Sequence, residues 1–155
     1  NLGRPILERK KIPMRGKKRK CINEPLLVGG KYYKLTCLSV GNPHCVIFTD
    51  DLLHFPLEKI GPKIEFCNLF PKRVNVEFVQ ILNRNEIGMR VWERGCGETL
   101  ACGTGACASV VAGNLLKKLE KNVKVHLLGG DLLIEFTDDI YLTGPVKKVF
   151  EGKLI

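Results

Sequence analysis

Alternating apolar and polar residues predict strands in the middle of the chain. In residues 73–82, Val74, Val76 and Phe78 occupy every second position, which is the spacing of one face of a strand. A short turn leads to a second predicted strand at 87–93. Because the connection is so short, the two strands are expected to pair antiparallel.

Short apolar runs between turn-forming residues predict further strands. The pair Gly29-Gly30 separates two such runs and predicts a hairpin. A short helix is predicted at 56–66, interrupted at Gly61-Pro62 because proline disrupts a helix. The remaining predicted strands are residues 45–49, 123–128, 132–137, 140–143 and 146–150.

Residues 105–119 have the apolar spacing of a helix and many small side chains, including Ala106, Ala112 and Gly113. Small residues on every side of a helix indicate close packing all round, as in a helix buried within a sheet. One long helix among many strands at hairpin spacing predicts the α+β class with a mostly antiparallel sheet.

Composition narrows the class of protein. The 155 residues are 45% apolar and 26% charged, as in a soluble globular domain. The longest apolar stretch, near 106–116, is too short to cross a bilayer, and the N-terminus has no apolar signal core. Seven cysteines, an odd number, favour free thiols in a reducing compartment. Cys37 and Cys45 lie in apolar runs and are interpreted as small buried residues. We therefore expect a cytoplasmic protein with no membrane contact.

The net charge of +9 comes mostly from residues 9–20, which hold eight Lys or Arg and no acid. The rest of the chain holds 17 basic and 16 acidic residues. Such a run is able to bind phosphates, but it is more typical of a solvated, flexible loop. No aromatic residue interrupts it, so no stacking platform for nucleic-acid bases is predicted.

The candidate chemistry is concentrated in residues 93–109, which read E-R-G-C-G-E-T-L-A-C-G-T-G-A-C-A-S. A zinc site is disfavoured because Cys96, Cys102 and Cys107 lack C-x-x-C spacing and no histidine is near. The residues from Gly103 match a G-x-G-x-x-A dinucleotide loop, but that loop must directly follow a strand in a parallel βαβ unit. The surrounding strands are predicted antiparallel. No phosphate-binding P-loop and no serine nucleophile elbow is present.

A reactive cysteine is the remaining functional interpretation. Cys102 comes directly before Gly103 and Thr104 at the predicted helix start, where the helix dipole and free amides favour a thiolate. We therefore expect a lowered pKa at Cys102 and a cradle for a carboxylate or enolate. The alternative is a glycine-rich turn before a buried helix, in which the cysteine is merely small.

Polar residues elsewhere favour the functional interpretation. Arg94 is able to grip a carboxylate with two hydrogen bonds, and Glu93 is able to hold an ammonium group. Asn42 and His44 lie at a sharp break between strands, and Asn75 is polar within an apolar strand. Each has a structural alternative, as a turn former, a structural histidine and a solvent-facing residue respectively. Together they suit an amino acid with more than one carboxylate.

Four segments together resemble diaminopimelate epimerases in order and spacing: G-N-P-H-C from Gly41, R-V-N-V from Arg73, E-R-G from Glu93, and E-T-L-A-C-G-T-G-A-C from Glu98. The resemblance covers essentially the whole chain. It implies a mostly antiparallel sheet curled around one central helix. It also implies cofactor-independent epimerisation of LL- to meso-diaminopimelate, on the route to lysine and peptidoglycan, without a metal.

The resemblance implies a role for each matching residue. Cys102 is one of two cysteine acid/base residues, and Gly103 and Thr104 offer amides to the reacting carboxylate. Glu93 and His44 act near the reacting centre. Asn42, Asn75 and Arg94 bind the distal end of the substrate.

The second cysteine of the family, in a glycine-rich loop of an N-terminal domain, has no counterpart here. Residues 1–155 are therefore interpreted as a single C-terminal epimerase domain, expected to be inactive alone and to need an N-terminal half. The complete protein is expected to be a homo-oligomer. Proline-racemase-like or phenazine-type isomerases of the same fold, and a catalytically silent fragment, are the alternatives.

Overall fold

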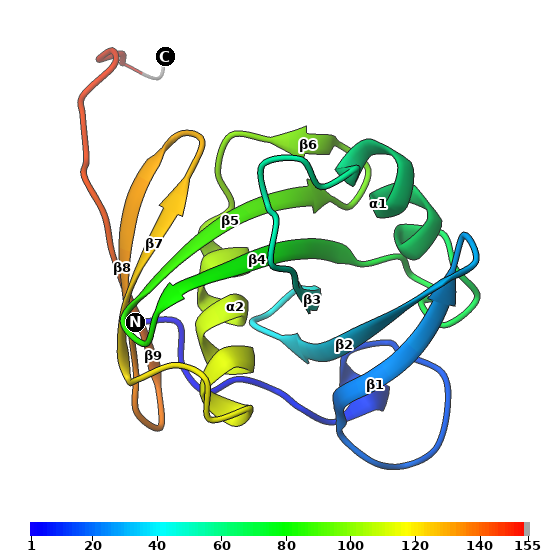
Figure 1. The fold of residues 1–155 in the computed structure, drawn as a ribbon. Coiled ribbons are helices and arrows are strands. Elements are labelled where there is room, and N and C mark those ends of the chain that lie inside the picture. Colours follow the sequence, from blue (N-terminus) through cyan, green and yellow to red (C-terminus); the bar gives the residue numbers. More distant parts are fainter. Residues whose placement is uncertain (154–155) are drawn as a thin grey trace.

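The computed structural model describes residues 1–153, so the last two positions of the predicted 1–155 domain lie outside it. A single nine-stranded sheet curls around helix α2, and helix α1 packs on its other side (Figure 1). The helices are the 3-10 turn η1 (Arg9–Lys11), α1 (Leu57–Glu65) and α2 (Gly103–Leu115). The strands are β1 (Cys21–Val28), β2 (Lys31–Ser39), β3 (Pro43–Phe48), β4 (Asn75–Asn83), β5 (Glu86–Glu93), β6 (Gly97–Thr99), β7 (Asn122–Leu127), β8 (Gly130–Phe136) and β9 (Ile140–Thr143).

The sheet is mostly antiparallel, as predicted. Its order is β1-β2-β3-β4-β5-β7-β8-β9, with β6 paired to β5. Only β3–β4 and β5–β7 pair in parallel among the described strands. The predicted hairpin at Gly29-Gly30 and the antiparallel pair β4–β5 are both confirmed.

The N-terminal segment closes the sheet around α2. Gly3 pairs with Ile140 of β9, and Ile6 pairs with Ser39 at the end of β2. One extended segment therefore links two strands that are far apart in the order of the sheet. The backbone groups of Ile140 and Ser39 that it binds would otherwise be unpaired edge groups.

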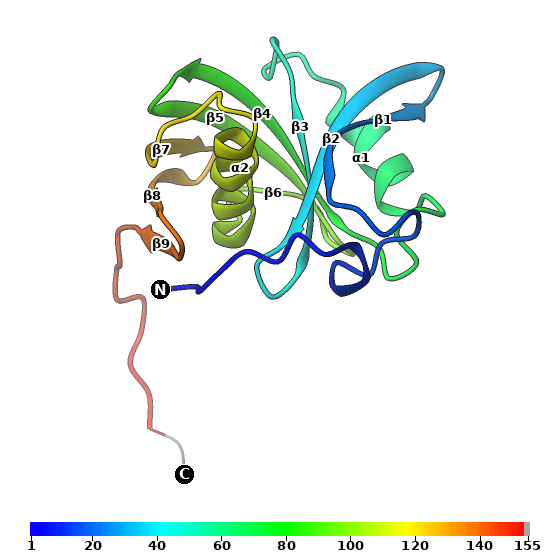
Figure 2. The ribbon, with the colours of Figure 1, turned by 90° about the horizontal axis from the view of Figure 1, so that it is seen from below.

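Helix α2 is buried on every side, as its small residues predict. All residues from Gly105 to Gly113 are buried, and the surrounding strands enclose the helix when the molecule is seen from below (Figure 2). Gly113 allows close approach of the following loop, because a Cβ there would lie 2.6 Å from Leu119 Cγ. The helix begins at Gly103, two residues before the predicted start at Gly105, since Cys102 caps it.

Helix α1 packs over a second core on the opposite face of the sheet, which includes Ile60, Ile64 and Phe78. The predicted interruption at Gly61-Pro62 is wrong, because the helix runs unbroken from Leu57 to Glu65. Gly61 packs flat against Trp92, and a Cβ there would lie 2.6 Å from the indole Cγ. This close packing holds the helix together although Pro62 contributes no amide hydrogen.

Two other expectations need correction, and one strand was not predicted. The predicted strand at 146–150 is an exposed tail, with Val146 98% and Phe150 86% exposed, because no strand edge lies beside it. Strand β6 was missed within the glycine-rich stretch. The strands flanking α2 are not antiparallel throughout, since β5 and β7 pair in parallel.

The basic run is only partly a solvated loop. Arg15 to Lys20 are exposed, as expected, but Arg9, Ile12 and Met14 are buried. The Arg9 guanidinium donates to the carbonyl oxygens of Arg15 and Arg19 and pairs with the Glu24 carboxylate. The loop is therefore folded back on an internal arginine, which charge patterning alone did not predict.

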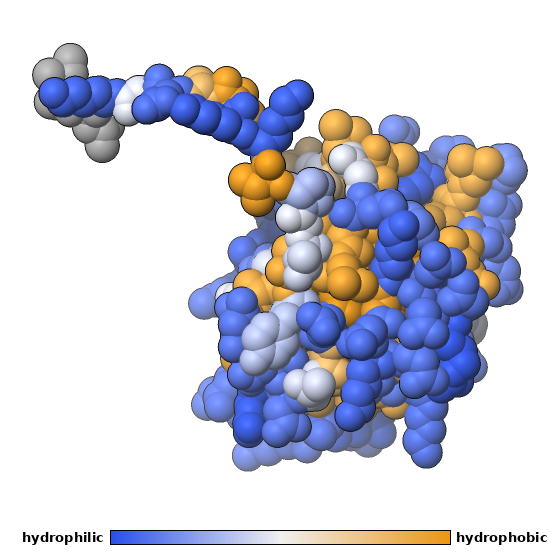
Figure 3. All heavy atoms as spheres, turned by 90° about the vertical axis from the view of Figure 1, so that its left-hand side faces the viewer, coloured by the Kyte–Doolittle hydropathy of each residue, from blue (hydrophilic) through white to orange (hydrophobic). Residues whose placement is uncertain are grey.

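Apolar side chains gather on the outer face of β7 to β9, near the start of the C-terminal tail (Figure 3). Leu128 and Leu133 are among the exposed apolar residues of this part of the sheet. No helix within residues 1–153 has both the length and the apolar character needed to span a membrane.

Candidate active site

Cys102 is the N-cap of helix α2. Its backbone is extended, with φ −138° and ψ 105°, and its sulfur accepts a hydrogen bond from Gly105 N at 3.3 Å. The amides of Gly103 and Thr104 belong to the first helical turn and have no acceptor within the helix. Both residues are partly exposed, so a sulfur and two free amides meet at the positive end of a helix.

A chain of hydrogen bonds leads from the sheet to Cys102. His44 of β3 and Glu77 of β4 are fully buried, and His44 Nδ1 lies 2.7 Å from Glu77 Oε1. The other ring nitrogen, Nε2, lies 2.9 Å from Asn42 Oδ1. Asn42 Nδ2 donates to Thr104 Oγ1 at 3.2 Å, and that hydroxyl lies 3.6 Å from the Cys102 sulfur.

The pKa of Cys102 is raised, which contradicts the expected lowering. Burial is the main cause, because the sulfur is largely withdrawn from water. The hydrogen bonds from Thr104 and Gly105 lower the pKa, as expected at a helix start. The negative charges of Glu77 and Glu93 raise it further. At neutral pH the site therefore holds a thiol.

Glu93 ends strand β5 beside this helix start. Thr99 of β6 donates its hydroxyl to Glu93 Oε1 at 2.5 Å, which fixes the carboxylate. Its charge contributes to the raised pKa of the Cys102 thiol, so the two predicted residues lie within electrostatic reach of each other.

Arg94 and Asn75 form a second group. Asn75 is buried rather than facing solvent: its amide nitrogen donates to Pro43 O at 3.0 Å, and its oxygen accepts from Arg94 N at 2.9 Å. It thus ties the start of β3 to the turn after β5. The Arg94 side chain is exposed and donates to Lys72 O at 3.2 Å. A direct contact between either side chain and a substrate stays a prediction.

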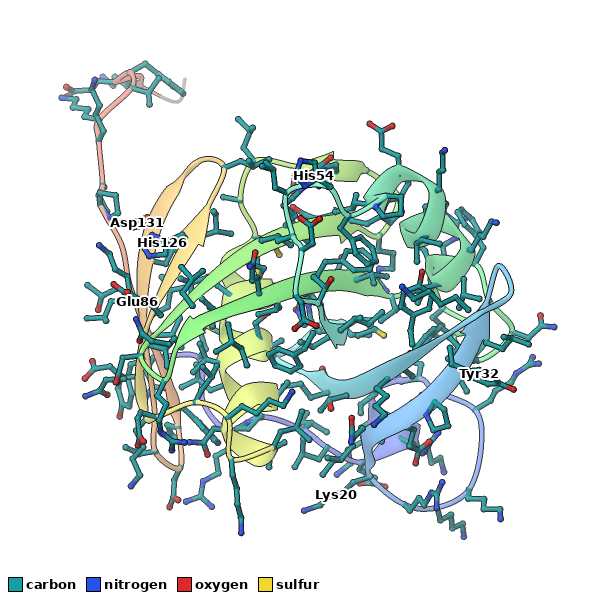
Figure 4. All side chains as sticks on the ribbon, viewed as in Figure 1. Lys20, Tyr32, His54, Glu86, His126 and Asp131 are labelled. Atoms are coloured by element: carbon teal, nitrogen blue, oxygen red, sulfur yellow. The ribbon has the colours of Figure 1, made fainter. Side chains whose placement is uncertain are left out.

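Sequence reasoning missed Glu77. The sequence carried only a weak signal: Asn75 and Glu77 share one face of the strand, and the next residue on that face, Val79, is apolar. His44 is the buried histidine of the chain, whereas His54 and His126 lie at the surface (Figure 4). His126 pairs there with Asp131, at 2.8 Å.

The other cysteines of the glycine-rich stretch lie apart from this chemistry. Cys96 is exposed on the turn after β5, and Cys107 is in the core. Cys37 and Cys45 are buried, as expected. Within residues 1–153, no three His, Cys, Asp or Glu side chains are grouped as metal ligands would be.

A diphosphate fits this helix start poorly. A Cβ at Gly105 would lie 2.9 Å from Glu77 Oε1, so a carboxylate occupies the space against the first turn. Its negative charge, with that of Glu93, opposes the binding of a dinucleotide. A cavity of about 790 Å³ lies elsewhere, within the loop of residues 8–20.

The fold is shared with solved structures of the PhzF family of phenazine biosynthesis proteins. A solved structure of a phenazine biosynthesis protein of the PhzF family from Bacillus anthracis matches with a TM-score of 0.51 and 21% identity. The match covers 66% of this chain and 34% of that one. A PhzF-family structure from Enterococcus faecalis matches with a TM-score of 0.50 and 17% identity, over 63% of this chain and 35% of that one. These likenesses establish the fold alone.

The sequence establishes the family. The pattern that defines the family "Diaminopimelate epimerase" matches residues 36–149. The diaminopimelate epimerase of Moorella thermoacetica is 51% identical over 98% of this chain and 56% of its own length. That of Acetivibrio thermocellus is 52% identical over 99% of this chain and 56% of its own length. The chain belongs to the diaminopimelate epimerase family and spans about half the length of these relatives.

Proposed function

We propose that the protein containing this chain is a diaminopimelate epimerase, and that the chain supplies one half of its active site. The enzyme interconverts LL- and meso-diaminopimelate by moving a proton at Cα, with neither a cofactor nor a metal. The observation that carries the proposal is the thiol of Cys102 at the start of a buried helix, beside two unpaired first-turn amides. The relatives named above support the substrate.

The chemistry needs an acid and a base on opposite faces of Cα. Cys102 has a raised pKa and holds a proton at neutral pH, so it serves as the acid for one face. The amides of Gly103 and Thr104 receive the carboxylate next to Cα, where negative charge builds up as the proton leaves. Glu93 lies beside the thiol and suits the substrate ammonium group or the return of a proton.

The remaining predicted residues act around this centre. His44 and Asn42 connect to Cys102 through Thr104. Arg94 is exposed and suits the distal carboxylate, and Asn75 holds the backbone of Arg94 in place. The distal end of diaminopimelate carries a second amino-acid group, which explains the need for both charged and polar partners.

The proposal extends to what this chain lacks. A single cysteine is unable to reach both faces of Cα, so an N-terminal half is proposed to supply the second one. We further propose that residues 1–155 form one C-terminal domain and that the complete protein is a homo-oligomer in the cytoplasm. The seven unpaired cysteines support that location. The substrate is a small molecule, with no nucleic acid involved.

Deuterium uptake at Cα in heavy water tests the proposal. The protein with its N-terminal half is expected to exchange the Cα hydrogen of diaminopimelate, and this chain alone is not. Cys102→Ala in the complete protein should abolish exchange and epimerisation together. Exchange by the isolated chain would contradict the half-site proposal, and full activity of Cys102→Ala would remove Cys102 from the mechanism.

A substrate panel addresses the alternatives. A proline-racemase-like isomerase would convert proline and leave diaminopimelate unchanged, and a phenazine-type isomerase would also leave diaminopimelate unchanged. A catalytically silent fragment would stay silent when the N-terminal half is restored. If diaminopimelate is the one substrate of the panel that is converted, both alternatives are excluded.

A further inference from the structure

The hydrogen bonds that reach Cys102 begin at a carboxylate buried beneath helix α2. Glu77 has no exposed surface, and its Oε2 has no hydrogen-bond partner among residues 1–153. A Cβ at Gly105 would lie 2.9 Å from Glu77 Oε1 and 3.2 Å from Cys102 Sγ, so carboxylate and sulfur contact the same glycine. A buried, half-unpaired carboxylate is unfavourable for packing, which indicates another role.

His44 lies between two acceptor oxygens, Glu77 Oε1 at 2.7 Å and Asn42 Oδ1 at 2.9 Å. A neutral imidazole has one N–H and is unable to donate to both. Two hydrogen-bond patterns therefore fit these contacts, and in the first the Glu77–His44 pair carries one proton more than a carboxylate beside a neutral imidazole. His44 then donates to Asn42, Asn42 donates to Thr104, and the Thr104 hydrogen is free to point at the Cys102 sulfur.

Loss of that proton reverses the direction of the hydrogen bonds between His44 and Thr104. His44 Nε2 becomes an acceptor, and the Asn42 amide must turn to donate to it. The Asn42 oxygen then takes the hydrogen of Thr104, and the sulfur keeps only the hydrogen bond from Gly105 N. The two patterns differ by one donor at the sulfur, and hydrogen-bond donors favour the thiolate over the thiol.

We propose that Glu77 is a positioning residue for Cys102: through His44 and Asn42, its carboxylate sets whether the Thr104 hydroxyl donates to the catalytic sulfur. The catalytic meaning of this role rests on the proposed function, but the state of the thiol does not. The titratable groups that face this network are His44 and Cys45 on β3, Glu93 on β5, and Cys102 and Cys107 at α2.

The rate of Cys102 alkylation by iodoacetamide against pH tests the proposal, in the complete protein without substrate. Tandem mass spectrometry must place the adduct by its fragment ions, because Cys96, Cys102 and Cys107 all lie between Arg94 and Lys117 and share one tryptic peptide. Asn42→Asp offers only acceptors, so it takes the Thr104 hydrogen away from the sulfur and adds negative charge. We expect alkylation about tenfold slower at neutral pH, equal to about one unit of pKa.

Glu77→Gln is expected to act in the opposite direction. The amide nitrogen that this substitution introduces donates to His44 Nδ1, because the other position has no acceptor within residues 1–153. His44 then keeps its hydrogen on Nε2 and the direction toward Cys102 persists. The second pattern, in which the Glu77 carboxylate carries an uncompensated negative charge that raises the pKa of the thiol, is no longer available. Alkylation should be about threefold to tenfold faster at neutral pH.

Glu65→Gln is the matched control. Glu65 is also a buried carboxylate, but it lies on α1 and binds Trp92 Nε1 and Gly95 N. Its alkylation profile should equal that of the wild type. Wild-type profiles for folded Asn42→Asp and Glu77→Gln would overturn the proposal. If Glu77→Gln does not fold, Asn42→Asp and Thr104→Val test the proposal instead. Both variants are expected to slow alkylation of Cys102, and an unchanged rate in either would overturn the proposal.

The alkylation experiment and the epimerase assay test different claims, so either claim can fail without the other. Shifted alkylation profiles in a protein that does not epimerise diaminopimelate would refute the proposed function and support the role of Glu77. Unshifted profiles in an active epimerase would refute the role of Glu77 alone.

Discussion

At the scale of single residues, burial decides the state of the thiols in this chain. Helix α2 offers Cys102 the hydrogen bonds that stabilise a thiolate, yet the pKa of Cys102 is raised because the sulfur is buried and two carboxylates lie near. The helix dipole acts only within the first turn and is modest beside the loss of hydration. The site therefore stores a proton at neutral pH, as an acid needs to.

The same effect at Cys107 predicts a dependence of stability on pH. Burial raises the pKa of the Cys107 thiol from 9.0 to about 12. Between these values the unfolded chain has released the proton and the folded chain has not. The folded state thus binds more protons, and the free energy of unfolding falls as pH rises, by about 1.4 kcal/mol per pH unit for one thiol.

Urea denaturation at about pH 8 and about pH 10 measures this loss. Cys107→Ala has no thiol to titrate, so it should lose about 1 kcal/mol less than the wild type over that interval. The cavity left by the substitution affects both pH values equally and cancels in the comparison. An equal loss in both proteins would contradict the raised pKa.

Arg94→Lys tests the carboxylate clamp. Lysine keeps the positive charge but replaces a planar fork with a point charge, so two parallel hydrogen bonds to a carboxylate are lost. In the complete enzyme we expect KM to rise about tenfold with kcat little changed, the pattern of a lost ground-state contact. An unchanged KM would show that Arg94 does not hold the distal carboxylate.

At the scale of elements, glycines set how closely the helices pack. A Cβ at Gly113 of α2 would lie 2.6 Å from Leu119 Cγ. Gly113→Ala should therefore destabilise the protein by about 1–3 kcal/mol, although alanine is the better helix former. Gly113→Ala/Leu119→Ala removes the two closest contacts and keeps only the Cβ of residue 119, at 3.3 Å, so chemical denaturation should show a smaller loss than the sum of the two single variants. Additive losses would mean that Gly113 is not needed for this contact.

The elements also show what the pattern of residues predicts and what it does not. Alternation in the sequence predicts β4 and β5, although burial alternates only in β5 and the first five residues of β4 are all buried. Helix α2 is predicted because its small residues pack on every side. Local sequence signals fail where the structure depends on residues distant in the sequence. Helix α1 continues through Gly61-Pro62 because it packs against Trp92, and the tail that contains Val146 forms no strand because no strand lies beside it.

In the candidate site too, the residues that are adjacent in the sequence were predicted, and the contacts between distant residues were not. Cys102, Gly103 and Thr104 are adjacent in the sequence and were found there. The connection of His44 to Thr104 through Asn42 depends on the parallel pairing of β3 with β4 and on the helix above them. Glu77 was missed because a single carboxylate in a strand resembles an ordinary solvent-facing residue until both faces of β4 are known to be buried.

At the scale of the whole molecule, closure of the sheet keeps α2 and its thiol out of water. The closure depends on a few backbone hydrogen bonds of the N-terminal segment: Leu2 N and Gly3 O bind Ile140, and Ile6 binds Ser39. Since these pairs join distant strands, their loss would open the barrel-like wall without unfolding a helix or a hairpin.

Gly3→Ala tests this closure. Gly3 has φ +71° with open space around its Cβ position, so alanine adds backbone strain without a clash, about 1 kcal/mol. We expect faster amide hydrogen exchange at Ile140 and, through the opened wall, faster alkylation of Cys102. Gly30→Ala is the matched control, because Gly30 has φ +83° and equally open space but lies in the β1–β2 hairpin turn. Gly30→Ala should lower the free energy of global unfolding by a similar amount. The amide of Ile140 should nevertheless exchange its hydrogen only through global unfolding, and not through a local opening of the sheet. Equal exchange at Ile140 in the two variants would show that the N-terminal segment does not control the opening of the sheet.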